Sequence, residues 1–208
     1  MQLRMVLGYS AAAFTAICLM LFVGWWQVDG PGSPKSLLQR PLGLSDMDFR
    51  LTDHDGTEVG PGTLVGRPTM VFFGFTHCPD VCPTTLADIS GWLDALQEDA
   101  RRLNVIFVTV DPERDTVDTM AEYVGNFHPM IRGWTGPASQ ITPAVKGFRA
   151  KFEMIPTVDD DYTMNHTASV FLFDATGRFV STIDYHEPEE FAVPKILRTL
   201  KAGAEQMT

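Results

Sequence analysis

The chain opens with a long hydrophobic segment and continues with shorter hydrophobic runs separated by polar residues. Residues 5–26 contain no charged side chain, and about 20 apolar residues suffice for a helix to cross a bilayer. This run is longer than the apolar core of a cleavable signal peptide, and no small-residue cleavage site follows Trp26. The pattern predicts an uncleaved transmembrane anchor over residues 1–26. Because Arg4 precedes the span, we expect a cytoplasmic N-terminus and the rest of the chain outside the cytoplasm.

The segment after the anchor has a different composition. Residues 27–46 concentrate glycine, proline and serine, which is typical of a tether between a membrane and a domain. We therefore expect a linker over 27–46 and a folded domain over 47–208. At the start of that domain, hydrophobic and polar residues alternate around the pair Asp55-Gly56, which predicts a small hairpin.

Two apolar runs in the domain have the length and composition of buried strands. They cover residues 69–75 and 104–111, and each is followed by hydrophobic residues at helical spacing. The first predicted helix begins near Pro83, and the second is capped by Asp115 or Thr116. The residues that mark the two helices are Leu86, Ile89, Trp92, Leu93 and Leu96, and then Val117, Met120, Ala121, Val124 and Phe127.

The remaining pattern completes a recognisable order of elements. We predict a short helix over residues 142–152, a hairpin over 168–185 and a final helix near 194–202. The resulting order is β-α-β-α, an insertion, then β-β-α. A right-handed βαβ unit followed by an antiparallel hairpin and a closing helix indicates an α/β, thioredoxin-like fold.

Composition narrows the classes of partner. The 208 residues are 45% hydrophobic and 20% charged, which suits one compact domain with a sizeable core. The formal net charge is −10, so the surface repels nucleic acid, and we exclude nucleic-acid binding. An acidic surface would suit a basic or metal-bearing partner, although solvated acidic faces are common without one.

The candidate chemistry lies at the end of the first predicted strand. Cys78 and Cys82 stand there with three residues between them, where the following helix begins. Residues four apart share a helix face, so the pair could form a disulfide or bind one metal ion. A helix N-terminus stabilises a thiolate, which serves both electron exchange and metal binding. The third cysteine, Cys18, lies within the predicted span and is set aside as a buried apolar side chain.

The position of His166 favours a metal site over a disulfide. In a thioredoxin-like arrangement the loop that enters the hairpin faces the cysteines, which places His166 opposite them. Two thiolates and one imidazole suit copper, whereas a structural zinc site normally needs a fourth ligand that is not evident here. His77 is a minor candidate for an auxiliary ligand. We expect the other histidines, His54, His128 and His186, to lie at the surface, and the acidic run 159–161 to be solvated or to attract copper or a basic partner.

Three segments together carry a family resemblance. "FGFTHCPDVCPTTL", "VTVDPERDT" and "DYTMNHTASVFLFD", in this order after an N-terminal anchor, resemble the Sco/SenC family of copper-handling proteins. The resemblance implies a thioredoxin-like domain tethered to an inner membrane, on its periplasmic or intermembrane-space side. It implies a copper chaperone, with copper as Cu(I), Cu(II) or both, that helps metallate the binuclear site of cytochrome c oxidase subunit II. Another copper chaperone would be the donor.

The same resemblance assigns residues. It makes Cys78, Cys82 and His166 the copper ligands, and it gives Asp111 an accessory role in shaping the site or docking a partner. An equally good interpretation of Asp111 is a strand-end residue that caps the "PERDT" turn. The main alternative function is a thiol-disulfide reductase in which Cys78 and Cys82 act on the cysteines of the oxidase copper site. A third is a peroxidase, because "VCPTT" resembles a peroxiredoxin site. The first two need the same reactive thiolates, so the sequence leaves open whether the protein is an enzyme.

Overall fold

The computed structural model of the chain describes residues 14–26, 40–158 and 161–204. It separates into two compact units, Met1–Arg40 and Pro41–Thr208. Each unit is described by itself.

The described part of the first unit is a helix over residues 14–26, and all of its side chains are exposed. Among the described residues, no helix combines the length and the apolar character needed to cross a membrane. Residues 1–13 of the predicted anchor and residues 27–39 of the predicted linker lie outside the described residues.

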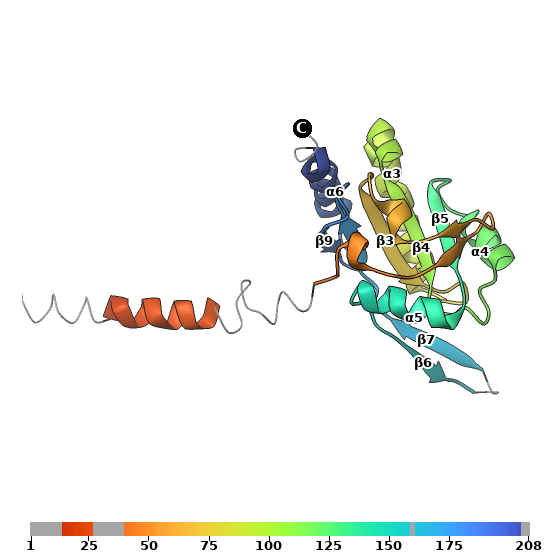
Figure 1. Cartoon of the computed structure of the whole chain (residues 1–208), viewed down its shortest axis with the longest axis horizontal. Helices are drawn as coiled ribbons and strands as arrows, with labels where there is room; N and C mark the ends of the chain where they lie inside the picture. Colours follow the sequence, from red (N-terminus) through yellow and green to blue (C-terminus); the bar gives the residue numbers. More distant parts are fainter. Residues whose placement is uncertain (1–13, 27–39, 159–160, 205–208) are drawn as a thin grey trace, which may run out of the picture. The chain divides into compact units, whose positions relative to one another are not determined.

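A seven-stranded sheet with the order β2-β1-β5-β4-β3-β8-β9 forms the centre of the second unit (Figure 1). Strands β3, β4 and β5 are parallel, β8 is antiparallel to β3, and β9 is antiparallel to β8. All residues of β3 are buried, so both faces of the sheet are covered at its centre. This arrangement confirms the predicted thioredoxin-like α/β fold. The strands are β1 (Leu51–Asp53), β2 (Glu58–Val59), β3 (Thr69–Gly74), β4 (Asn104–Thr109), β5 (Ile131–Thr135), β8 (Val170–Phe173) and β9 (Phe179–Ile183).

Four α-helices pack around this sheet, and three short 3-10 helices join the elements. The two predicted hydrophobic helices are present, and the five residues that marked the first of them are all buried. That helix, α3, packs against α6. The α-helices are α3 (Val81–Leu96), α4 (Val117–Val124), α5 (Ala138–Gly147) and α6 (Glu189–Ala204), and the 3-10 helices are η1 (Leu44–Asp46), η2 (Pro61–Leu64) and η3 (Gln97–Arg102).

Strand β5 was not predicted, because Arg132 and Gly133 interrupt its apolar pattern. The structure shows why the strand tolerates the charge. Arg132 donates through Nε to the carboxylate of Asp53 at 3.1 Å, and the indole N–H of Trp134 donates to the same carboxylate at 3.0 Å. A buried acid on β1 therefore satisfies the polar groups of its neighbour β5.

The predicted helix over 142–152 is wrong at both ends. Helix α5 begins earlier, at Ala138, and ends at Gly147, shortly before Arg149 takes a left-handed backbone with φ 56°. The next residues form β6 (Phe152–Pro156), which pairs antiparallel with β7 (Tyr162–His166) in a separate two-stranded sheet. The predicted insertion is therefore a β-hairpin, and His166 ends a strand instead of lying in a loop.

Two helix boundaries also differ from the prediction. Helix α4 ends at Val124, so Phe127 lies outside it, and its N-cap is Thr116, whose Oγ1 accepts the N–H of Thr119 at 3.2 Å. Helix α6 starts at Glu189, more than one turn before the proline at which the sequence predicted its beginning. In both helices tertiary packing, more than propensity, sets the boundary.

Candidate metal centre

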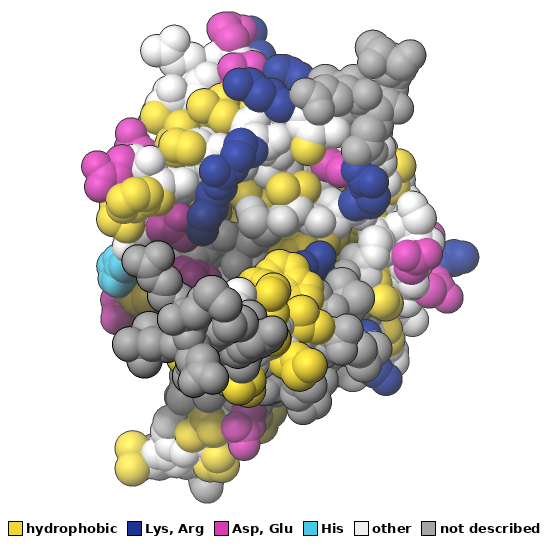
Figure 2. All heavy atoms as spheres, turned by 90° about the vertical axis from the view of Figure 1, so that its left-hand side faces the viewer, with side chains coloured by type: hydrophobic (Ala, Val, Ile, Leu, Met, Phe, Trp, Pro, Cys, Tyr) yellow, Lys and Arg dark blue, Asp and Glu magenta, His cyan; other side chains and the backbone are white. Residues whose placement is uncertain are grey.

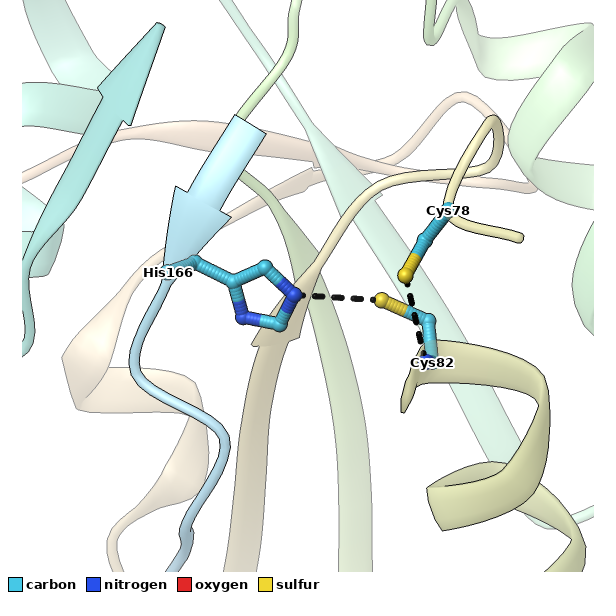
Figure 3. Close-up of side chains that lie close together, drawn as sticks. All are labelled: Cys78, Cys82 and His166. Carbon is cyan, nitrogen blue, oxygen red and sulfur yellow. Dashed lines mark hydrogen bonds between the residues drawn. The ribbon is translucent and has the colours of Figure 1, made fainter. Parts of the chain in front are cut away.

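The two cysteines occupy the junction between β3 and α3. Cys78 lies in the connecting loop, and Cys82 lies in the first turn of the helix, where its N–H donates to Cys78 Sγ at 3.3 Å (Figure 3). The Cys82 side chain is fully buried, whereas Cys78 is half-buried. Gly74 makes room for this sulfur, because a Cβ there would lie 2.6 Å from Cys82 Sγ and 2.7 Å from Cε2 of Phe107.

His166 approaches the cysteines from the end of β7 (Figure 3). Its Nε2 lies 3.3 Å from Cys82 Sγ, and its Nδ1 lies 3.0 Å from the backbone carbonyl of Thr167. Because a carbonyl only accepts, Nδ1 must carry the proton, and Nε2 is left with a lone pair directed at the sulfurs. The rings of Phe72 and Phe75 meet the imidazole edge-on, with centroids 6.1 and 5.9 Å away. The ring is therefore oriented by both a hydrogen bond and packing.

Together these three side chains form a group fit for a soft metal ion. Two Sγ atoms and one imidazole nitrogen all lie within 4.8 Å of one another. In the part of the chain that the structure describes, no further histidine, cysteine or carboxylate joins them. Two thiolates and an imidazole match the donors that copper prefers, and the set falls short of the four ligands of a structural zinc site.

The two thiols differ in acidity. A hydrogen bond from the Cys82 thiol lowers the pKa of Cys78 to about 4, against the opposing effect of burial, and the backbone N–H of Cys82 adds to the lowering. The pKa of Cys82 is raised, first because its thiol donates that hydrogen bond and second because it is buried. Cys78 is thus the thiolate of the pair and the more accessible sulfur, while Cys82 keeps its proton until a cation or a disulfide replaces it.

Asp111, just after β4, connects this strand to β7, the strand that ends at His166. Its buried carboxylate accepts a hydrogen bond from Tyr162 Oη at 2.8 Å and an ion pair from Nε of Arg114. The Arg114 guanidinium also covers the Tyr162 ring at 3.8 Å from its centroid. The main-chain carbonyl of Asp111 accepts N–H groups of the following turn, so its geometry fits both interpretations of the residue. Of the acidic run, only Asp161 is described, and its carboxylate lies 3.3 Å from Arg114.

The role of Asp115 was not predicted from the sequence, which suggested this residue only as a helix cap. Its side chain is fully buried and accepts hydrogen bonds from the N–H of Thr76 at 3.0 Å, from Thr76 Oγ1 at 2.6 Å and from Thr109 Oγ1 at 2.5 Å. Burial raises the pKa of this carboxyl, and these hydrogen bonds oppose the rise. Asp115 therefore fixes the loop that leads to Cys78. The sequence contained one signal for this role, namely the second acidic residue, Asp115, in the "VTVDPERDT" segment.

The other histidines stay away from this group. His77 directs Nδ1 to the neighbouring Thr76 hydroxyl at 3.1 Å, and its side chain is 55% exposed. The prediction that His54 and His128 lie at the surface is wrong, because their side chains are only 17% and 19% exposed. Each accepts a backbone N–H through Nδ1, which explains its burial. His186 is exposed, as predicted.

A second set of possible ligand atoms is already neutralised. Asp53, His54 and Asp55 lie close enough together to hold an ion. The guanidinium of Arg132, however, forms ion pairs with both carboxylates. An arginine therefore occupies the position that a cation would take.

Comparison with known proteins agrees with this site. The SCO1/SenC family model matches residues 39–201. The zebrafish (Danio rerio) protein described as a mitochondrial SCO2 homolog is 36% identical over 78% of this chain and 60% of its own length. This chain spans from 44% to 65% of the length of the curated relatives it matches.

Solved structures with bound copper have the same fold. Bradyrhizobium japonicum ScoI with copper bound is 44% identical, covers 76% of this chain and 99% of its own, and superposes with a TM-score of 0.70. Yeast Sco1 with copper bound is 34% identical, covers 80% and 93% of the two chains, and has a TM-score of 0.71.

Proposed function

The chain belongs to the SCO1/SenC family, and on that premise we propose that it is a copper chaperone that holds its cargo between Cys78, Cys82 and His166. Solved relatives include Sco proteins with copper bound, and one solved structure is described as a member of the Sco family of cytochrome c oxidase assembly proteins. We propose that this chain receives copper from another chaperone and delivers it to the binuclear site of oxidase subunit II.

The single observation that carries the proposal is the convergence of two sulfurs and one imidazole nitrogen, with Cys82 Sγ 3.3 Å from His166 Nε2. The half-buried Cys78 thiolate would meet the incoming copper first. Cys82 would then release its proton as it binds, and the Nε2 lone pair would complete the site. Thiolates hold Cu(I) with few ligands, whereas Cu(II) prefers nitrogen and oxygen donors, so the imidazole matters most for Cu(II).

We propose that residues 1–26 anchor the protein in an inner membrane and that a linker joins them to the copper-binding domain on the non-cytoplasmic side. In the structure this domain begins at Pro41, ahead of the predicted boundary at residue 47, because Leu44 is fully buried in its core. Two observations support the anchor. The run 5–26 contains no charge, and the large apolar side chains of the helix over 14–26 are between 46% and 75% exposed. An exposed apolar surface of this kind is typical of contact with lipid or with another protein.

One observation favours thiol-disulfide reduction as a second function. A low-pKa, accessible Cys78 beside a buried, protonated Cys82 is the asymmetry that a dithiol reductant needs. Cys78 Sγ would attack a target disulfide and release one target thiol. Cys82 would then attack the mixed disulfide, which releases the second target thiol and leaves a Cys78–Cys82 disulfide. Two electrons pass to the target together with the Cys82 proton, and a second proton comes from solvent because Cys78 reacts as a thiolate. An external dithiol would restore the reduced pair.

A titration of three variants with each copper ion tests the proposal. We expect His166→Ala to keep Cu(I) but to lose the thiolate-to-Cu(II) absorption band. Cys78→Ala or Cys82→Ala should lose tight binding of both ions, by at least the roughly 10- to 100-fold that loss of a supporting residue costs. His186→Ala, which changes an exposed histidine outside the site, is the matched control and should bind like the wild type. Full Cu(II) binding by His166→Ala would refute the ligand assignment.

Oxidase assembly in cells separates the two functions. Under limiting copper, we expect His166→Ala cells to assemble less oxidase and added copper to restore assembly. A reductase that needs only its two cysteines would work normally in those cells. Normal assembly with His166→Ala at low copper would therefore favour thiol reduction over copper delivery.

A further inference from the structure

A hollow of about 670 Å³ lies directly beside the proposed copper site. It is bounded by α5 on one side and by the β6–β7 hairpin on the other, and His166 forms part of its wall. Two lysines, Lys146 from α5 and Lys151 just before β6, line it as well, together with one acid, Glu153 of β6, so the cations outnumber the acid in its wall. A molecule bound in this hollow would therefore lie next to one of the proposed copper ligands.

The charge around the hollow is opposite to that of the protein. Lys146, Arg149 and Lys151 are exposed, and none of them forms a side-chain hydrogen bond or ion pair with any described residue. Arg132 and Lys195, in contrast, are each held by a carboxylate. The chain as a whole carries a net charge of −10. Three unpaired cations in six consecutive residues form a local patch that would attract carboxylates.

The hollow continues into an exposed apolar strip along the hairpin. Met154 is 49% exposed and Val158 is 81% exposed, and Phe152 and Ile155 are each exposed by more than a third. In Figure 2 hydrophobic side chains are visible on the projecting part at the bottom of the view, where the hairpin lies. This strip extends the binding surface well beyond the reach of a small anion. A protein segment is the ligand that could use both the cations and the apolar side chains.

Strand β6 also offers free backbone groups. It pairs only with β7, and the N–H of Thr157 and the carbonyl of Lys151 both bond toward the β7 side. Because hydrogen-bonded pairs alternate in an antiparallel ladder, the backbone groups of Phe152 and Met154 point to the open edge. Pro156 has no N–H and limits how far a new strand could extend. An open edge of this kind is a template for an added strand.

We propose that an extended acidic segment of the copper-receiving protein docks here, with its backbone along β6 and its carboxylates on Lys146 and Lys151. The identity of the partner rests on the proposed function, but the surface itself does not. Docking at this position brings the recipient to the side of His166. The recipient could then replace the imidazole while the two sulfurs still hold the copper ion.

Charge-reversed variants of the full chain, with both substitutions in the unit over residues 41–208, test the proposed docking surface. The probe is the soluble copper domain of the same organism's oxidase subunit II, in its metal-free form. We expect Lys146→Glu with Lys151→Glu to weaken binding about tenfold, chiefly through a slower association rate and a smaller salt dependence. The matched control, Arg198→Glu with Lys201→Glu, makes the same change in net charge on exposed positions of α6 and should bind like the wild type. Equal losses in both variants would refute a specific surface.

Amide hydrogen exchange tests the strand addition. The N–H groups of Phe152 and Met154 should gain protection in the complex, and absence of that gain would refute docking along β6. If inorganic phosphate displaces the probe at equal concentration, the hollow is a small-anion site and the inference is wrong. Both experiments use metal-free proteins, so their outcomes do not depend on whether the chain binds copper. They therefore test the docking surface even if the copper titration refutes the proposed function. Conversely, a wild-type chain that binds copper normally but does not bind the probe would overturn this inference alone.

Discussion

The proposed metal centre joins two regions that are built differently. Cys78 and Cys82 belong to the β3–α3 junction, where the strand is fully buried and pairs on both sides. His166 belongs to the β6–β7 hairpin, a two-stranded sheet in which every residue of β6 is exposed. One half of the site thus adjoins a fully buried central strand, and the other half belongs to an exposed hairpin.

This difference matters for a protein that must both hold and release copper. The cysteine half is fixed by packing around Gly74 and by the Asp115 hydrogen bonds to the loop. The histidine half is held by the Asp111–Tyr162 hydrogen bond, the Arg114 guanidinium and the packing of β7 on the core through Met164 and His166. Its other strand, β6, is exposed along its whole length. A two-stranded hairpin is only marginally stable alone. We therefore expect the imidazole to leave the ion before the sulfurs do.

Hydrogen exchange should show the largest contrast. The amides of β3 and β4 should exchange only through global unfolding, whereas those of β6 and β7 should exchange through local opening of the hairpin. With a stability typical of a small domain, the rates should differ by about a thousandfold or more. Exchange measured by NMR on the metal-free protein tests this, and equal protection in the two sheets would contradict the comparison. Addition of Cu(II) should slow exchange in the hairpin more than addition of Cu(I).

A methyl group at Gly74 should damage the cysteine half selectively. In Gly74→Ala the new Cβ would stand 2.6 Å from Cys82 Sγ, so the sulfur or Phe107 must move. We expect a loss of about 1–3 kcal/mol in the free energy of unfolding, as in overpacked cores, and weaker binding of both copper ions. Urea denaturation and competition titration measure the two effects. The control is Gly91→Ala in α3, where the methyl meets open space and should stabilise the helix by up to about 1 kcal/mol. Unchanged copper affinity in Gly74→Ala would contradict the account.

Sequence was a good guide to the cysteine half. Strand β3 and helix α3 are local patterns, an apolar run followed by hydrophobic residues at helical spacing, and both appeared where they were predicted. Burial of the complete strand makes its signal continuous and therefore easy to identify. The position of Cys78 and Cys82 at the strand-to-helix junction followed directly.

The histidine half was harder to predict, because its structure depends on contacts distant in the sequence. Strand β6 is short and exposed throughout, so no buried apolar run marks it, and its first residue, Phe152, was assigned to the end of the predicted helix. Strand β5 was missed because the partner of Arg132, Asp53, stands 79 residues away. The proximity of His166 to the cysteines was inferred from topology, and the structure places its Nε2 3.3 Å from Cys82 Sγ although the surrounding loop proved to be a strand.

Removal of one hydroxyl should weaken the histidine half alone. Tyr162→Phe deletes the 2.8 Å hydrogen bond to Asp111, which fastens β7 to β4. We expect Cu(II) affinity to fall about tenfold, as when a supporting residue of a metal site is lost, with Cu(I) affinity unchanged. The free energy of unfolding should fall by about 1 kcal/mol. Tyr185→Phe, outside the site, is the control. An equal loss for Cu(I) and Cu(II) would mean that the hairpin also positions the cysteines, which would contradict the division into two halves.

The smallest effect is expected at the base of the hairpin, where Thr167 Oγ1 accepts the N–H of Lys151 at 2.9 Å. Thr167→Val keeps the shape and β-propensity of the side chain but removes this acceptor, at a cost of about 0.5–1 kcal/mol. Because the bond closes the hairpin next to His166, the cost should fall on local opening. We expect a few-fold faster Cu(II) dissociation in stopped-flow measurements and a global unfolding midpoint close to that of the wild type. Thr182→Val, the same change on β9, should alter neither the rate of Cu(II) dissociation nor the unfolding midpoint. If Thr167→Val lowers global stability without changing Cu(II) dissociation, the hairpin unfolds with the core, and the histidine half is not the independent, release-prone part of the site.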